Sequence, residues 1–93
     1  MQKRQLKHPE GKKAISMESA KYAALKTSFT DCLTAKKTAS FDELLLDVTE
    51  DLKNKKIVIQ GVIKWNLFWV TLDMEANKEL KKNTSVSPYI YSI

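Results

Sequence analysis

Residues 60–93 read QGVIKWNLFWVTLDMEANKELKKNTSVSPYIYSI, and this stretch decides the fold. Apolar side chains recur at helical spacing in its first half, which predicts a helix over residues 62–77. Two short runs follow, residues 80–82 and residues 89–93, with a polar segment ending in Pro88 between them. Extended runs on either side of a polar turn are typical of a β-hairpin. The last third of the chain is therefore predicted to be a long helix with a hairpin directly after it.

The predicted helix over residues 62–77 is apolar on two sides. The first apolar stripe, which we expect to face the core, contains Ile63, Leu67, Val70 and Met74. The second stripe brings together Trp65, Phe68 and Trp69. A helix that is apolar nearly all round is covered on more than one side. The second stripe could be covered in two ways. The N-terminal residues or the first helix of the same chain could pack on it, or another protein molecule could, for which a homodimer is the simplest choice.

Two further helices are predicted earlier in the chain. Ser16 is a suitable N-cap for a helix over residues 17–35. The apolar stripe of this helix contains Tyr22, Leu25, Phe29 and Leu33. Residues 36–39 break the helical pattern and are expected to form a very short strand. Ser40 and Glu43 then have the spacing of a capping box, which predicts a second helix that ends near residue 53.

The order helix, short strand, helix, helix, hairpin predicts an α+β fold of the winged helix-turn-helix type. Such a domain has three helices and a small antiparallel β-hairpin, the wing. In the predicted hairpin, Tyr89, Tyr91 and Ile93 alternate onto one face, which we expect to lie over the core.

The net charge of +5 lies mostly at the start of the chain. Residues 1–13 carry five basic side chains and one acidic side chain, whereas residues 14–93 carry eleven and ten. We assign residues 1–14 to an irregular, flexible basic arm and residues 15–93 to the winged-helix domain. A basic arm on a near-neutral domain suits contact with nucleic acid or another anionic partner, although a solvated tail would have the same composition.

The composition argues against catalysis and against metal binding. His8 is the only histidine and lies in the arm, so no Ser-His-Asp or Cys-His arrangement on a rigid frame is available. Cys32 is the only cysteine, which excludes a cysteine-based zinc site, and two glycines are too few for a phosphate loop. No cofactor is expected, and neither a membrane-spanning run nor a signal peptide is visible. The expectation is a cytoplasmic protein without enzymatic activity.

Several segments resemble a family of small uncharacterised bacterial winged-helix proteins. The segments that carry the resemblance are HPEGK at residues 8–12, residues 16–22, Trp65, and LDMEA at residues 72–76. The resemblance implies a winged helix and, by wider analogy, DNA binding and transcription regulation, but it carries over no functional residue. This chain has Lys78 where winged helices often have a glycine before the wing, which leaves the end of the third helix open.

Two functions are compatible with these patterns. In a winged helix the third helix enters the major groove, and the wing and an arm contact the backbone. The candidate contacts to double-stranded DNA are Lys64, Asn66, Thr71, Lys78, Lys81, Lys82, Lys3, Arg4, Lys7, Lys12 and Lys13. Five acids predicted on the second helix would oppose phosphate. The alternative is a winged-helix module for protein association or dimerisation through Trp65, Phe68 and Trp69, without DNA contact.

Overall fold

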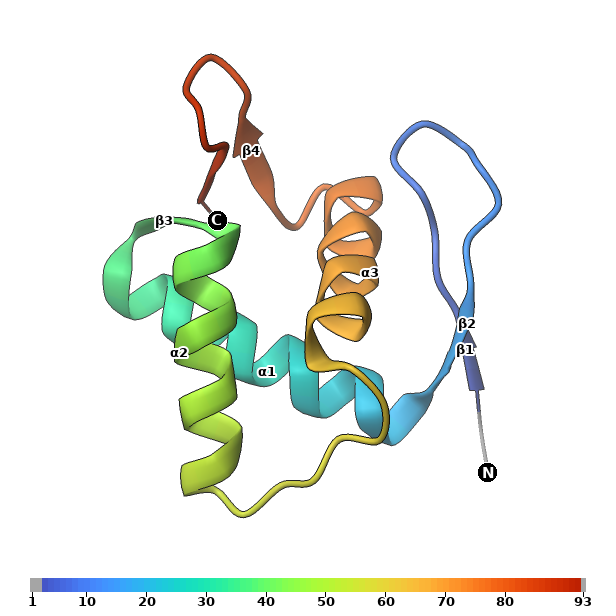
Figure 1. The fold of residues 1–93 in the computed structure, drawn as a ribbon. Helices are drawn as coiled ribbons and strands as arrows, with labels where there is room; N and C mark the ends of the chain where they lie inside the picture. Colours follow the sequence, from blue (N-terminus) through green and yellow to red (C-terminus); the bar gives the residue numbers. More distant parts are fainter. Residues whose placement is uncertain (1–2, 93) are drawn as a thin grey trace.

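The computed structural model describes residues 3–92, which form an α+β fold of three helices and two small antiparallel sheets (Figure 1). In chain order the elements are β1 (Lys3–Gln5), β2 (Ser16–Glu18), α1 (Ser19–Lys36), β3 (Thr38–Ser40), α2 (Phe41–Asn54), α3 (Ile63–Ala76), β4 (Lys81–Asn83) and β5 (Ile90–Ser92). The three predicted helices, the strand between the first two and the C-terminal hairpin are present in the predicted order. No helix in this part of the chain is long and apolar enough to cross a membrane.

The core lies where the three helices meet. The predicted apolar stripe of α1 and the inner face of α2 are buried there: Tyr22, Leu25, Phe29, Leu33, Leu44, Val48 and Leu52. From α3, Leu67, Val70 and Met74 are buried, and Ile63 packs against them while partly exposed. The helical spacing read from the sequence therefore identifies the core correctly. Burial of these side chains supplies the hydrophobic term, at about 25 cal/mol per Å² of apolar surface.

Strands β3, β5 and β4 form a three-stranded antiparallel sheet in that order, so the last strand of the chain is its centre. Tyr91 is buried, and its ring meets the ring of Phe29 edge-on at 6.2 Å, which confirms the prediction that Tyr91 faces the core. The same prediction is wrong for Tyr89, which is 51% exposed. Tyr89 precedes β5, where strand pairing has not begun, and the alternation of the strand does not apply to it. Ile93 lies outside the described residues.

The N-terminal residues depart most from the sequence-based expectation. Strands β1 and β2 pair antiparallel, with Arg4 opposite Met17, so residues 3–18 form a hairpin in place of the expected irregular arm. Leu6 and Met17 from this hairpin are buried in the same core as the helices. Residues 1–2 of the expected arm lie outside the described part of the chain.

The same hairpin changes the start of α1. Ser16, the predicted cap of this helix, instead pairs with Gln5 in the hairpin, and its hydroxyl donates to the Gln5 side chain at 2.9 Å. The helix begins at Ser19, and no side chain caps it. The N-cap prediction for Ser16 is therefore wrong, because a local capping preference competes with strand pairing across eleven residues.

The start of α2 follows the predicted capping box in part. The Ser40 hydroxyl accepts a hydrogen bond from the Glu43 N–H at 3.3 Å, as predicted. The Glu43 carboxylate accepts from the Ser40 hydroxyl at 3.2 Å rather than from the Ser40 amide. Of the two main-chain contacts of a capping box, the structure therefore shows the one made by the Glu43 N–H.

Lysines end both α2 and α3 in the left-handed conformation. Lys56 and Lys78 have φ angles of 59° and 61°. After α3, the Glu79 N–H donates to the Met74 carbonyl at 2.8 Å, the long hydrogen bond of a Schellman motif. Lys78 therefore occupies the position that glycine adopts most easily, and it ends α3 in spite of its Cβ. This resolves the open end of the third helix.

Candidate nucleic-acid interface and aromatic groove

Basic side chains from two hairpins gather at one end of the molecule. Figure 1 shows the β1–β2 loop and the β4–β5 hairpin rising on either side of the C-terminal end of α3. We call the lysines of this region the basic end; they are Lys7, Lys12, Lys13, Lys78, Lys81 and Lys82. Residues 3–14 and 75–82 together carry eight basic and three acidic side chains, whereas residues 15–74 carry eight of each. The whole excess positive charge therefore lies in these two segments.

Acidic side chains lie among the lysines of the basic end. Lys12 pairs with Glu10 at 3.1 Å and is the main cause of a lowered pKa of the Glu10 carboxyl. Lys82, from the other hairpin, lowers the same pKa further. The Lys82 ammonium also lies 3.4 Å from the Glu75 carboxylate at the end of α3.

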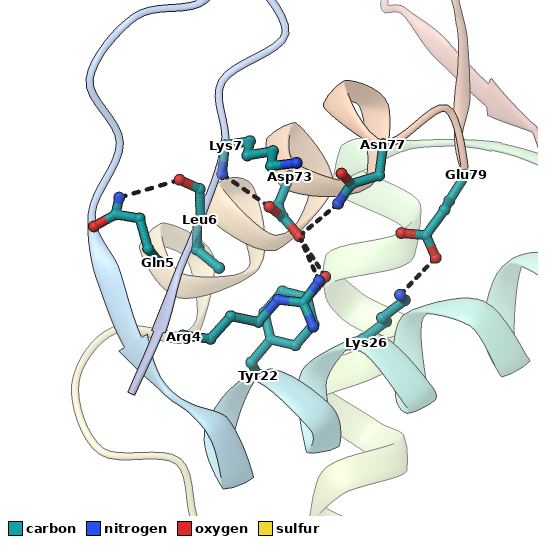
Figure 2. Close-up of polar contacts among 9 residues, drawn as sticks. All are labelled: Arg4, Gln5, Leu6, Lys7, Tyr22, Lys26, Asp73, Asn77 and Glu79. Carbon is teal, nitrogen blue, oxygen red and sulfur yellow. Dashed lines mark hydrogen bonds and ion pairs between the residues drawn. The ribbon is translucent and has the colours of Figure 1, made fainter. Parts of the chain in front are cut away.

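A buried carboxylate holds the N-terminal hairpin against α3 (Figure 2). Asp73 is 1% exposed and accepts hydrogen bonds from the Lys7 backbone N–H at 2.8 Å and the Tyr22 hydroxyl at 2.5 Å. The Asn77 side-chain amide donates to it at 3.3 Å, and the Arg4 guanidinium lies 3.6 Å away. Both carboxylate oxygens therefore have partners, which a buried charge requires. We call this arrangement the Asp73 clamp.

Arg4 and Tyr22 reinforce the Asp73 clamp. The Arg4 guanidinium lies 4.2 Å from the centre of the Tyr22 ring, within the range of a cation–π contact. Burial, and then the hydrogen bond to Asp73, raise the pKa of the Tyr22 hydroxyl, so the hydroxyl stays protonated and keeps donating. The sequence places Arg4 among the candidate DNA contacts, but these contacts give it a role in positioning the hairpin.

Most of α3 is closed to a partner. The predicted DNA contact at Thr71 is wrong, because Thr71 is fully buried and its hydroxyl donates to the Phe68 carbonyl at 2.6 Å. Asn66 is half-buried, and its side-chain amide donates to the Val62 carbonyl at 2.8 Å. Lys64 alone among the predicted DNA contacts within Ile63–Ala76 is exposed.

The predicted contacts outside α3 are better placed. Exposed candidates in the two hairpins and just after α3 are Lys3, Lys7, Lys12, Lys13, Lys78 and Lys81. Lys82 is half-buried between Glu75 and the ring of Tyr89. The basic surface of this chain therefore comes from its hairpins, with a small share from α3.

The predicted aromatic cluster on α3 divides into two parts. Trp69 is half-buried, packs against the core and meets the ring of His8 edge-on at 6.4 Å. The N-terminal hairpin thus covers Trp69, which is one of the two covers left open by the sequence. Trp65 and Phe68 remain 65% and 40% exposed.

Trp65 and Phe68 line a groove of about 730 Å³ between α3, the start of α2 and the segment that leads into β5. We call it the aromatic groove; its other lining residues are Phe41, Asp42, Lys64, Ser87, Pro88, Tyr89 and Tyr91. The rings of Phe41 and Phe68 meet edge-on at 6.2 Å. The Lys82 ammonium lies 5.3 Å from the centre of the Tyr89 ring, so the groove adjoins the basic end.

Sequence reasoning misses two aromatic residues of this groove. The local patterns place Phe41 only within a capping box and Tyr89 over the core. Phe41 is the first residue of α2 and Tyr89 lies just before β5, where periodicity carries no information about orientation. Their proximity depends on how α2 and the wing pack, which no local pattern encodes.

Three of the five acids of α2, Glu43, Asp47 and Asp51, lie in ion pairs. Lys36 contacts Asp47 at 2.7 Å, and Lys55 contacts Asp51 at 3.0 Å. The buried Ser28 hydroxyl also donates to Asp51 at 2.6 Å and, together with Lys55, lowers the pKa of the Asp51 carboxyl. In Figure 1, α2 runs away from the two hairpins. These acids therefore oppose a phosphate at the basic end less than the sequence suggests.

The described residues show little that could support chemistry. Cys32 is half-buried, and burial, followed by the charge of Asp51, raises the pKa of its thiol. A raised pKa reduces the thiolate fraction on which cysteine reactivity depends. Among residues 3–92, no three His, Cys, Asp or Glu side chains gather as ligands of a metal ion would.

Comparison with curated proteins and with solved structures gave no match to this chain. One family of unknown function (DUF6958) matches residues 3–89. This range spans β1 through Tyr89 and so contains both the basic end and the aromatic side chains of the groove that lie on α2, α3 and the segment before β5. The chain therefore belongs to this family of unknown function.

Proposed function

We propose that this protein is a winged-helix DNA-binding protein that acts in regulation and has no catalytic activity. The element order from α1 to β5 supports the winged-helix assignment, because β3, β5 and β4 form the small sheet that this fold places beside its third helix. The β1–β2 hairpin is an addition at the N-terminal side of that domain.

The charge distribution is the observation that carries this proposal. All of the excess positive charge lies in residues 3–14 and 75–82, and the fold brings the β1–β2 loop and the β4–β5 hairpin of these segments to one end of the molecule (Figure 1). Lysines on two projecting hairpins are suited to neutralise phosphates, and phosphate contacts provide most of the affinity of a DNA-binding protein. The wing and the N-terminal hairpin would therefore position the protein on the backbone.

The number of lysines sets the expected salt dependence. Each phosphate neutralised on duplex DNA adds about −0.9 to the slope of log affinity against log salt. The six lysines of the basic end set the upper limit on the magnitude of that slope. Lys82 should contribute less than the others, because its ammonium already contacts the Glu75 carboxylate. We expect a slope of about −3 to −5 on random-sequence duplex DNA.

The test is fluorescence anisotropy with a labelled random-sequence duplex over a salt series. Substituting Lys81→Ala with Lys82→Ala, or Lys12→Ala with Lys13→Ala, should weaken binding and reduce the magnitude of the slope by about 1 per lysine. The control is Lys53→Ala with Lys56→Ala, which removes the same charge from the far end of α2. Absence of duplex binding at low salt, or equal losses in the control, would refute the proposal.

Protein association is the second candidate, and the exposure of Trp65 and Phe68 favours it. It makes a different prediction: Trp65→Ala should change the oligomeric state or the capture of a protein partner and leave duplex binding unchanged. Sedimentation of the unsubstituted chain and of Trp65→Ala over a concentration range distinguishes the two candidates.

A further inference from the structure

We infer that the aromatic groove binds the unpaired bases of single-stranded DNA, with the phosphates of the same strand on the adjoining basic end. This inference deepens the proposed function and rests on it. It concerns Trp65, Phe68 and Tyr89, which duplex binding through the hairpins does not use.

Exposed aromatic faces provide the first argument. Trp65, Phe68 and Tyr89 are 65%, 40% and 51% exposed, around a groove of about 730 Å³. A volume of this size lies within the range of sites that bind small molecules. Aromatic side chains bind the faces of bases by stacking, and they do so with little regard to sequence.

Continuity with the basic end provides the second argument. Lys82 lies over the ring of Tyr89 at 5.3 Å and belongs to the basic end, while Lys64 lines the groove itself. A strand whose bases stack on Trp65 and Tyr89 would therefore meet lysines next to its backbone. A basic track beside aromatic platforms is the arrangement that single-strand-binding proteins use.

Asp42 is the acidic side chain that lines the groove. It lies at the start of α2. Its carboxylate repels phosphate. The phosphates are therefore expected to lie near Lys64 and Lys82 and not next to Asp42.

The shape of α3 provides the third argument. Its second half is closed within the fold, with Thr71, Leu72 and Asp73 buried. The exposed first half presents Trp65 and Phe68, which offer flat apolar faces where base-edge readout needs polar side chains. In a duplex the face of each base is covered by the neighbouring bases. Trp65 and Phe68 can therefore reach a base face only where a strand is unpaired.

The experiment compares one strand with its duplex. Binding of a labelled twelve-nucleotide oligothymidylate and of a twelve-base-pair duplex is measured for the full chain at equal salt. We expect Trp65→Ala to weaken single-strand binding about ten-fold or more, the loss that removal of one stacking partner produces, and to leave duplex binding within about two-fold. Trp65→Phe, which keeps an aromatic face, should restore most of the single-strand affinity.

Fluorescence gives a direct readout of the stacked base. Trp65 and Trp69 are the only two tryptophans, so Trp69→Phe leaves Trp65 as the sole emitter. Oligothymidylate should quench its emission in proportion to the bound fraction, whereas duplex should not. Near-ultraviolet circular dichroism of each variant establishes that the fold is kept, which we expect because Trp65 is mostly exposed.

The outcomes separate this inference from the proposed function. Unchanged single-strand binding by Trp65→Ala, alongside weaker duplex binding by Lys81→Ala with Lys82→Ala, would overturn the inference and keep the proposed function. Equal loss on both probes would also overturn it, because stacking should matter for the single strand alone. A dimer that Trp65→Ala converts to a monomer would overturn it by assigning the groove to a second copy. Failure to bind either probe at low salt would end both proposals.

Discussion

Replacing Asp73 by alanine should destabilise the protein far more than replacing an exposed carboxylate. The Asp73 carboxylate is 1% exposed and joins three parts of the fold: the N-terminal hairpin through Lys7, α1 through Tyr22, and α3 on which it lies. Removing it leaves the Lys7 N–H and the Tyr22 hydroxyl without an acceptor in the protein interior (Figure 2). Breaking a buried charge network in this way costs about 3–5 kcal/mol.

Two further variants divide that cost among the contacts. Asp73→Asn keeps the shape and one acceptor oxygen but loses the charge, so we expect a loss of about 2 kcal/mol, since hydrogen bonds to charged groups contribute about 1 kcal/mol more each than neutral ones. Tyr22→Phe should cost about 1–2 kcal/mol. The double variant Asp73→Ala with Tyr22→Phe should be close to Asp73→Ala alone, because the hydroxyl has already lost its acceptor.

Urea unfolding followed by circular dichroism measures these free energies, and the slope with denaturant shows whether unfolding stays two-state. Hydrogen exchange of the Lys7 amide reports the hairpin contact directly and should become fast in Asp73→Ala. The matched control is Asp31→Ala, which removes an exposed carboxylate from α1 and should change stability by about 0.5 kcal/mol or less. A loss below about 1 kcal/mol for Asp73→Ala, with the Lys7 amide still protected, would refute the reasoning.

Three other perturbations test separate features. Lys78→Gly should stabilise the protein by about 0.5–1 kcal/mol in urea unfolding, because glycine adopts the φ of 61° without a Cβ penalty; a loss would contradict the left-handed end of α3. Leu6→Ala should cost about 2–5 kcal/mol, because Leu6 is 2% exposed in the core; a cost near zero would mean that the N-terminal hairpin is not packed. Burial raises the pKa of Tyr22 and of Tyr91 above the ordinary 10.0, so the folded state keeps protons that the unfolded chain loses. Stability should therefore fall above pH 10 by up to about 1.4 kcal/mol per pH unit for each tyrosine, and an equally steep fall in Tyr22→Phe would contradict this assignment.

The helices and the β4–β5 hairpin could be predicted because their signals are local. The spacing of Tyr22, Leu25 and Phe29 identifies the buried face of α1, and Ser40 with Glu43 marks the start of α2 within one residue. Such signals depend on side chains within about one helical turn of each other. A short stretch of sequence is therefore enough to read them.

The N-terminal hairpin could not be predicted from the same signals. Its strands are three residues each, and its register depends on pairing Arg4 with Met17 across a polar loop. What holds the hairpin is Asp73, fifty-five residues beyond the end of β2, together with burial of Leu6. From the sequence alone, an aspartate on an apolar helix is expected to be exposed to solvent, because aspartate is seldom buried unless it is paired.

The features of the candidate sites also divide into those that the sequence predicts and those that only the tertiary structure decides. The sequence by itself determined the helical faces, the C-terminal hairpin and the basic character of residues 1–13. It also shows that the chain has one histidine and one cysteine. Only the tertiary structure decided that the lysines of both hairpins share one end, that Trp69 is covered while Trp65 is exposed, and that Thr71 is buried. The physical reason is the range of the interactions. Periodicity and capping act between near neighbours in the chain, whereas burial, charge and pairing act between whichever groups the fold brings together.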